Sequence, residues 1–251
     1  MRVIFLGKHT GGTNNCLGVD AITHLSRYCD VVQCVVGSQD KLYDYCINSH
    51  INVTEDITQC YNLNNIDLII SYGWGKKITQ KLIDTARIGC INFHPAPLPD
   101  WRGMGGVFNY ALYENLTDWG CSAHFVDTTF DTGDIIKTIK FSIQGVDTIY
   151  SLTKLSHKYM LSLLEDVIGV VLQNKSTPEL IPRVKQGKGR YISKKDLDLL
   201  REIKLDDSSQ EIDNKIRSCF CPPHHGAFIT LKGKQYSIIN SEILSKINLE
   251  Q

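Results

Sequence analysis

The stretch Cys90-Ile91-Asn92-Phe93-His94-Pro95-Ala96-Pro97-Leu98-Pro99-Asp100-Trp101-Arg102-Gly103 joins a short apolar run to a proline-rich loop. The short apolar run predicts a buried strand. Asn92 and His94 have the same parity on that strand, so their side chains leave on one face where the strand ends. The alternate prolines predict a stiff, extended loop with three backbone donors removed. The stretch therefore predicts two polar side chains at the edge of a sheet.

Three similar apolar runs precede this strand, at residues 3–6, 31–36 and 68–70. Helix-like stretches separate them, with apolar residues repeating at four-residue spacing. These are Leu17, Ala21 and Leu25 in one stretch, and Ile78, Leu82 and Ala86 in another. Alternating strands and helices predict an α/β fold with a parallel sheet and right-handed crossovers. Because ligands bind beyond the carboxyl ends of such strands, the loops beginning at Gly7, Ser71 and His94 are candidate site loops.

The pattern changes after residue 103. We expect a helix over 103–115, then two extended runs at 122–128 and 135–143 joined by the turn Phe130-Asp131-Thr132-Gly133-Asp134. Asp147 is a candidate N-cap of a long helix. That helix carries Ile149, Leu152, Leu155, Tyr159, Leu163, Val167 and Val171 toward the core. The sequence turns polar after residue 174, which predicts a catalytic domain over 1–174 and a linker with a small C-terminal module over 175–251.

The charge balance excludes several classes of protein. The 251 residues hold 27 Lys and Arg and 27 Asp and Glu, for a net charge of zero, with 42% apolar residues. A neutral chain argues against nucleic acid or an acidic membrane surface as a partner. Nine scattered cysteines, no signal-peptide pattern and no long apolar run favour a cytoplasmic protein with free thiols.

A third polar residue completes a candidate constellation. Asp131 lies in the predicted turn, which we expect to fold back over the edge that holds Asn92 and His94. A carboxylate beside a histidine favours the charged ring, and an amide with an imidazolium forms a donor pair for a developing oxyanion. Because no nucleophile elbow such as G-x-S-x-G is present, we expect the attacking group to belong to the substrate.

These motifs resemble the N10-formyltetrahydrofolate-dependent formyltransferases, over residues 1 to about 174. The shared pattern is Asn92-x-His94, then Pro-Leu-Pro-x-x-Arg102-Gly103, then Asp131-Thr132-Gly133-Asp134. The resemblance implies a Rossmann-like catalytic domain, N10-formyltetrahydrofolate as the formyl donor, and Asn92, His94 and Asp131 as catalytic residues. A substrate amine would attack the formyl carbon, with the oxyanion stabilised by Asn92 and His94 and with His94 kept charged by Asp131.

The resemblance also implies that two loops hold the folate donor mainly through their backbone. The expected residues are Tyr72, Gly73, Trp74, Phe130, Thr132, Gly133 and Asp134. Glycines allow close approach of the backbone, and Trp74 can cover an aromatic ring. The alternative that Tyr72 and Trp74 are ordinary aromatics at the rim stays open.

For the acceptor, the proline run and the tail after Gly189 resemble the nucleotide-sugar N-formyltransferases. We expect dTDP-4-amino-4,6-dideoxyglucose or a dTDP-3-amino sugar, in the synthesis of a bacterial O-antigen, and the sequence leaves UDP open as the nucleotide in place of dTDP. The expected substrate-binding residues are Lys8, Gly11, Gly12, Lys76, Lys77, Arg102, Gly103, Tyr191 and Phe220. The alternatives are a methionyl-tRNA or glycinamide ribonucleotide formyltransferase, a formyltetrahydrofolate hydrolase, and a non-catalytic folate- or nucleotide-binding module.

A second cluster, Cys219-Phe220-Cys221-Pro222-Pro223-His224-His225, has ligand types that zinc uses. Its cysteines are separated by one residue, which is closer than structural zinc sites use, so we expect no metal. By resemblance, the C-terminal module is also expected to form a homodimer.

Overall fold

The computed structural model of the chain describes all residues except 9–16, 38–40, 104, 146–147, 223 and 248–251. The chain forms two compact units built from interleaved segments. The first comprises Met1–Arg102, Gly120–Lys140 and Ser156–Arg190, and the second comprises Gly103–Trp119, Phe141–Leu155 and Tyr191–Gln251. Residues 175–190 thus lie in the first unit, and the domain boundary after residue 174 stays a prediction.

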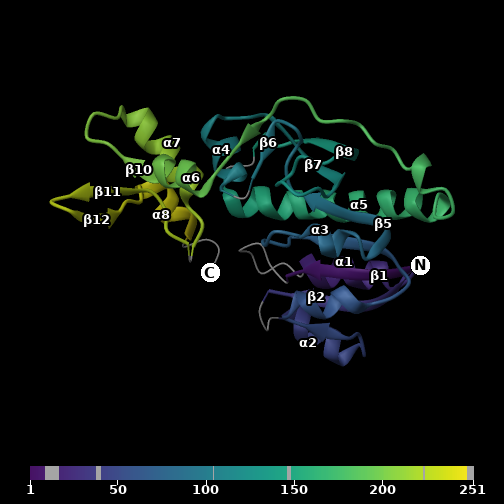
Figure 1. Cartoon of the computed structure of the whole chain (residues 1–251). Helices are drawn as coiled ribbons and strands as arrows, with labels where there is room; N and C mark the ends of the chain where they lie inside the picture. The colour runs from purple at the N-terminus through teal and green to yellow at the C-terminus, as the bar shows by residue number, and fades with distance from the viewer. Residues whose placement is uncertain (9–16, 38–40, 104, 146–147, 223, 248–251) are drawn as a thin grey trace. The chain divides into compact units, whose positions relative to one another are not determined.

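Within the described residues, the largest sheet has seven strands in the order β3-β2-β1-β4-β5-β7-β8. Figure 1 labels β1, β2, β5, β7 and β8 of this sheet. Their bounds are β1 Arg2–Gly7, β2 Asp30–Val36, β3 Val53–Thr54, β4 Ile66–Tyr72, β5 Ala86–His94, β7 Asp118–Phe125 and β8 Ile135–Ser142. The pairs β1 with β2, β1 with β4, β2 with β3 and β4 with β5 are parallel, whereas β5 and β7 are antiparallel. The predicted, mostly parallel α/β sheet is therefore confirmed.

The central strands of the sheet are buried on both faces. Four consecutive β1 residues, Val3 to Leu6, are fully buried, as is Leu68-Ile69-Ile70 in β4. Continuous apolar runs of this kind are typical of central parallel strands covered on both sides. The ends of β1, β4 and β5 then leave Gly7, Tyr72 and His94 at one edge of the sheet.

The described ranges contain the α-helices α1 Leu17–Leu25, α2 Lys41–Asn48, α3 Gln80–Ile83, α4 Val107–Tyr113, α5 Ile149–Gln173, α6 Lys194–Arg201, α7 Ser209–Cys219 and α8 Ser241–Ile247. The predicted face of α1 is buried through Leu17, Ala21 and Leu25. In the long helix α5, Leu163 and Val167 are fully buried. The Cys121 thiol of β7 donates to the Ser156 carbonyl of α5 at 3.4 Å.

Two predicted helices are shorter than expected. The stretch 78–86 forms only the four residues of α3, because the Thr79 side chain caps the helix start and Ala86 already begins β5. The helix predicted over 103–115 begins at Val107. Gly103 and Gly106 have φ values of +97° and +100°, which a right-handed helix does not adopt. Asp147, the predicted cap of α5, lies outside the described residues.

The second unit has its own small core. Strands β10 Glu202–Ile203, β11 Phe228–Leu231 and β12 Lys234–Ser237 form its sheet. A separate two-stranded sheet pairs β6 Trp101–Arg102 with β9 Arg190–Tyr191, and three of its four residues belong to the first unit. The buried cluster consists of Leu200, Ile203, Ile216, Cys219, Ala227 and Ile243. Helix α6 begins with a capping box, in which the Ser193 and Asp196 side chains each accept from the other's backbone N–H.

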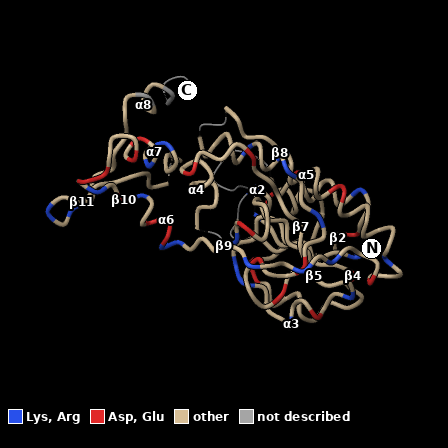
Figure 2. The backbone as a smooth tube through the Cα atoms, turned by 90° about the horizontal axis from the view of Figure 1, so that it is seen from above, with Lys and Arg blue, Asp and Glu red and all other residues tan. Residues whose placement is uncertain are grey.

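Basic and acidic residues are interspersed along the backbone (Figure 2). No helix in the described parts of the chain combines the length and the apolar character that crossing a membrane requires.

Candidate active site

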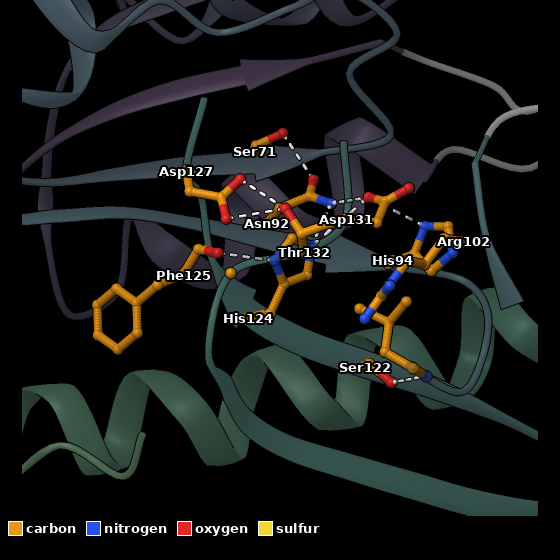
Figure 3. A network of polar contacts seen from close by, with 12 residues as sticks. Ser71, Asn92, His94, Arg102, Ser122, His124, Phe125, Asp127, Asp131 and Thr132 are labelled. Carbon is orange, nitrogen blue, oxygen red and sulfur yellow. Dashed lines mark hydrogen bonds and ion pairs between the residues drawn. The ribbon is translucent and has the colours of Figure 1, made fainter. Parts of the chain in front are cut away.

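Three strands place polar side chains in a row at the edge where β5 ends. Ser71 on β4 is the register partner of Asn92 on β5, which is in turn the register partner of His124 on β7. The Ser71 hydroxyl donates to Asn92 Oδ1 at 2.8 Å, and Asn92 Nδ2 lies 3.0 Å from His124 Nε2 (Figure 3). Directly paired residues on neighbouring strands meet side by side, so the sheet itself sets the orientation of the Asn92 amide.

The turn between β7 and β8 returns to this row, as the sequence predicted. Oδ1 of Asp131 lies 3.4 Å from Asn92 Nδ2, 3.7 Å from His94 Nδ1 and 3.6 Å from His124 Nε2. Asp131, His94 and His124 are all buried. The structure therefore brings together Asn92, His94 and Asp131, which come from two separate segments of the chain.

His94 has one ring nitrogen committed to the protein backbone. Its Nε2 lies 2.7 Å from the Trp101 carbonyl, and because a carbonyl only accepts, Nε2 carries the hydrogen. Burial lowers the pKa of His94 below its ordinary value, although the charge of Asp131 and the bond to Trp101 act in the opposite direction. The ring is therefore neutral at pH 7, which differs from our expectation that Asp131 keeps it charged. The lost hydration of the imidazolium outweighs the carboxylate.

His124 is a further member of this network, and residue type and spacing did not identify it as a site residue. Its Nδ1 donates to the Phe125 carbonyl at 2.7 Å, which leaves Nε2 as an acceptor for the Asn92 amide. On the sequence, His124 is a lone histidine in an apolar strand, a pattern typical of the core. The register of β5 against β7 is the signal that identifies it.

A second carboxylate, that of Asp127, accepts hydrogen bonds from two residues of the turn between β7 and β8. Thr132 Oγ1 donates to both Asp127 oxygens at 2.8 Å, and the Thr129 amide donates at 2.9 Å. Burial alone would raise the pKa of Asp127, but these hydrogen bonds lower it. Gly133 is required here because a Cβ would lie 1.9 Å from the Phe125 carbonyl. Thus Thr132 and Gly133, predicted to bind the folate donor, also shape the turn.

The other predicted donor-binding residues differ in exposure. Phe130 is 40% exposed, and the Asp134 carbonyl accepts from the Phe125 amide. Tyr72 is fully buried, with its ring between those of Phe5 and Phe93. Gly73 has a φ of +68°.

Trp74 packs against the core of the first unit, with Lys76 Nζ 5.5 Å above its ring. The structure therefore places the Tyr72 ring and the Trp74 ring against the core, where burial of apolar surface holds them.

The predicted substrate-binding residues fall into four groups, three of which lie in the first unit or outside the described residues. Lys8, Lys76 and Lys77 are exposed in the first unit. Arg102 donates to Gln186 and Gly187, a pairing that the expected role in binding a diphosphate did not include. Gly11 and Gly12 lie outside the described residues.

The other three residues belong to the second unit. A Cβ on Gly103 would lie 2.4 Å from the Ile192 carbonyl. Tyr191 is 52% exposed, and Phe220 packs against the buried cluster of that unit. In the described part of the chain, no three His, Cys, Asp or Glu side chains are grouped as a metal site would require.

Comparisons with known proteins identify the family. The formyl transferase family matches residues 2–168. Methionyl-tRNA formyltransferase of Francisella philomiragia subsp. philomiragia is 32% identical over 187 residues, which cover 72% of this chain and 54% of that protein. GDP-perosamine N-formyltransferase of Brucella melitensis biotype 1 is 29% identical over 177 residues, covering 70% and 66%. The chain spans about half the length of the methionyl-tRNA formyltransferases that it matches.

Two solved structures share the fold. A 4-N formyltransferase from Francisella tularensis has a TM-score of 0.76 at 22% identity, covering 94% of this chain and 96% of that one. An N-formyltransferase from Helicobacter canadensis, in complex with folinic acid and dTDP-3-aminofucose, has a TM-score of 0.71 at 20% identity, covering 93% and 85%. With two thirds of its length matched by the family and its sheet matched by these folds, the chain belongs to the formyl transferase family.

Proposed function

We propose that this protein transfers a formyl group from N10-formyltetrahydrofolate to the amine of a nucleotide-linked amino-dideoxy sugar. The family membership supports formyl transfer, and the network of Asn92, His94 and Asp131 supports this edge of the sheet as the site. In this proposal the three residues are catalytic.

The N–H groups of Asn92 suit the oxygen of a formyl group under attack. When bound, N10-formyltetrahydrofolate supplies a formyl carbon open to attack by an amine, with N10 as the leaving nitrogen. Asn92 holds two N–H groups toward the site, and the 3.4 Å bond to Asp131 is longer and weaker than the 3.0 Å contact with His124. The hydrogen directed at Asp131 is therefore the one that a developing oxyanion can take over.

His94 and Asp131 together can accept the proton that the substrate amine loses. Since Nε2 of His94 is held by the Trp101 carbonyl, Nδ1 is the atom that gains a proton, next to the Asp131 carboxylate. A neutral ring at pH 7 can accept the proton that the amine loses, and the carboxylate stabilises the resulting imidazolium. The same proton is then available for the leaving nitrogen.

One observation carries the choice of a sugar acceptor. The fold of the 4-N formyltransferase extends over 94% of this chain and 96% of that one, whereas the sequence matches to methionyl-tRNA formyltransferase and GDP-perosamine N-formyltransferase cover 72% and 70% of this chain. The similarity therefore includes most of the second unit. The neutral net charge, and the interspersed basic and acidic residues along the backbone in Figure 2, argue against a polyanion such as tRNA as the acceptor.

The nucleotide is proposed to be dTDP and the sugar a 4-amino- or 3-amino-dideoxyhexose. The Helicobacter canadensis enzyme, whose complex contains dTDP-3-aminofucose, supports this choice, and the Brucella melitensis relative makes a GDP-linked sugar the competing acceptor. Action in the cytoplasm, a role in O-antigen synthesis and assembly as a homodimer stay predictions.

The experiment is a formylation assay with N10-formyltetrahydrofolate and four acceptors. These are dTDP-4-amino-4,6-dideoxyglucose, dTDP-3-aminofucose, GDP-perosamine and charged initiator methionyl-tRNA. We expect a formylated dTDP sugar, identified by mass spectrometry, and a much lower rate of product formation in Asp131→Asn. Formylation of the tRNA alone would overturn the proposed acceptor, and formate release with no formylated acceptor would indicate a hydrolase.

A further inference from the structure

A segment that follows α5 returns to the turn carrying Asp131. Ile135 and Val184 exchange both backbone hydrogen bonds, at 2.8 and 2.9 Å, which brings residues 184–187 alongside that turn. From this segment, Gln186 Nε2 donates to the Asp131 carbonyl at 3.1 Å and to the Gly133 carbonyl at 2.6 Å. One side chain thus holds both ends of the three-residue stretch that includes the proposed catalytic carboxylate.

The orientation of the Gln186 amide is itself fixed. Its Oε1 accepts from Arg102 Nε at 3.1 Å and from Arg102 Nη2 at 2.8 Å. The same guanidinium donates to the Gly187 carbonyl at 2.9 Å. Because the oxygen is held by two charge-assisted bonds, both N–H groups of the amide point at the turn.

The turn needs such support. Asp131 has a φ of +56°, in the left-handed region that non-glycine residues rarely adopt. Its contacts with Asn92, His94 and His124 are 3.4, 3.7 and 3.6 Å, all at the long end of polar contact. A small displacement of the backbone therefore decides whether the carboxylate still acts on these groups.

We propose that Gln186, oriented by Arg102, is a positioning residue that holds Asp131 against His94 and Asn92. Gln186 acts through the backbone carbonyls of Asp131 and Gly133. The inference rests on the proposed function in that it assigns Gln186 to the same active site. It also gives a reason for the hydrogen bonds between Arg102, at the end of the proline-rich loop, and Gln186, which lies 84 residues later in the sequence.

The segment has other anchors, so the Gln186 side chain can be changed without releasing it. The Arg183 guanidinium lies 3.5 Å from the centre of the Phe125 ring, and the bridge between Ile135 and Val184 uses only backbone atoms. A Cβ on Gly189 would lie 1.8 Å from the Pro99 carbonyl, which shows how closely the backbones approach. We therefore expect Gln186 variants to fold.

Two variants separate the roles of the Gln186 amide. Gln186→Met keeps the length and removes all of its hydrogen bonds, whereas Gln186→Glu keeps the acceptor for Arg102 and removes only the donors to the turn. We expect both to lower kcat by about 10- to 100-fold while KM for each substrate changes by less than about threefold, since misplacement of about 1 Å has effects of this size. Lys185→Ala, at the exposed neighbouring position, is the control and keeps the wild-type kcat.

A second readout does not depend on turnover. The charged and titratable groups that act on His94 are Asp131, which raises its pKa, and His124, which lowers it. If Asp131 is released, the pKa of His94 measured by NMR falls further in Gln186→Met. A folded Gln186→Met with an unchanged His94 pKa, or normal kcat in both variants, would overturn the positioning role. If the wild type formylates no acceptor, the proposed function fails, while the NMR comparison still tests Gln186.

Discussion

Nδ1 of His94 faces Oδ1 of Asp131 at 3.7 Å, while Nε2 of the same ring donates to the Trp101 carbonyl at 2.7 Å. The backbone bond selects the tautomer, and the carboxylate marks the nitrogen that can take a proton. Burial lowers the pKa of His94, so the ring is neutral at pH 7 and competent as a base. The acid–base behaviour of the proposed reaction is therefore set by this pair.

The pH dependence of kcat tests that pair. His94 must be neutral to accept a proton, so kcat falls on the acid side with an apparent pKa below the ordinary histidine value of about 6.5. Because the Asp131 charge raises the pKa of His94, Asp131→Asn lowers this apparent pKa further, in addition to reducing kcat. Rate profiles between pH 4.5 and 8 measure both effects. An acid limb centred above pH 7 would contradict a neutral His94.

Asn92→Ala removes the amide that donates into the site. We expect kcat to fall by about 10²- to 10³-fold, the usual effect of losing one oxyanion donor. Ser71→Ala serves as the matched control, since it removes only the hydroxyl that orients Asn92 from the next strand. Its kcat should fall by about tenfold or less, because the His124 contact still orients the amide. Equal losses in the two folded variants would remove Asn92 from the catalytic role.

Gly133→Ala tests the shape of the turn. The added Cβ would meet the Phe125 carbonyl at 1.9 Å, so the turn must shift. We expect a loss of stability of about 2 kcal/mol or more, as for other steric insertions into packed sites, together with reduced turnover. Gly187→Ala is the control, because a Cβ there meets nothing within 4 Å. Urea unfolding of both variants gives the comparison, and an unaffected Gly133→Ala would show that the turn is not packed as described.

Stability against pH tests a buried histidine outside the site. Burial lowers the pKa of His157 to about 4, and the charge of Lys8 acts in the same direction. Below a pH of about 6.5, the ordinary pKa of histidine, the unfolded chain binds a proton at this residue that the folded chain does not bind. The contribution of His157 to stability is therefore complete above that pH and is lost as the pH falls toward about 4. Between pH 7.5 and 5 this histidine accounts for a loss of about 2 kcal/mol. His157→Leu should remove that part of the pH dependence, and an unchanged difference between the two pH values would refute the assignment.

Much of the sheet could be predicted because its strands are continuous apolar runs, as in Val3 to Leu6, and because apolar spacing identifies α1. Helix ends were harder to predict. Capping by Thr79 shortens α3, and the left-handed Gly106 delays the start of α4. These are local backbone conformations that apolar periodicity does not encode.

In the site, Asn92, His94 and Asp131 were recognisable from their motif. His124 was not, because its role depends on which residue of β5 it faces. Arg102 was expected to bind phosphate, yet it pairs with Gln186. Such partners are chosen by tertiary contacts between distant segments, so residue type and spacing could not reveal them.

The proposed acceptor is tested most directly by the kcat/KM of the purified protein for dTDP-4-amino-4,6-dideoxyglucose, dTDP-3-aminofucose and methionyl-tRNA, each with N10-formyltetrahydrofolate. We expect a formylated dTDP sugar, a kcat/KM for at least one sugar that exceeds that for tRNA by about 10³-fold or more, and a large loss of activity in Asn92→Ala. A preference for tRNA, or full activity in Asn92→Ala, would contradict it.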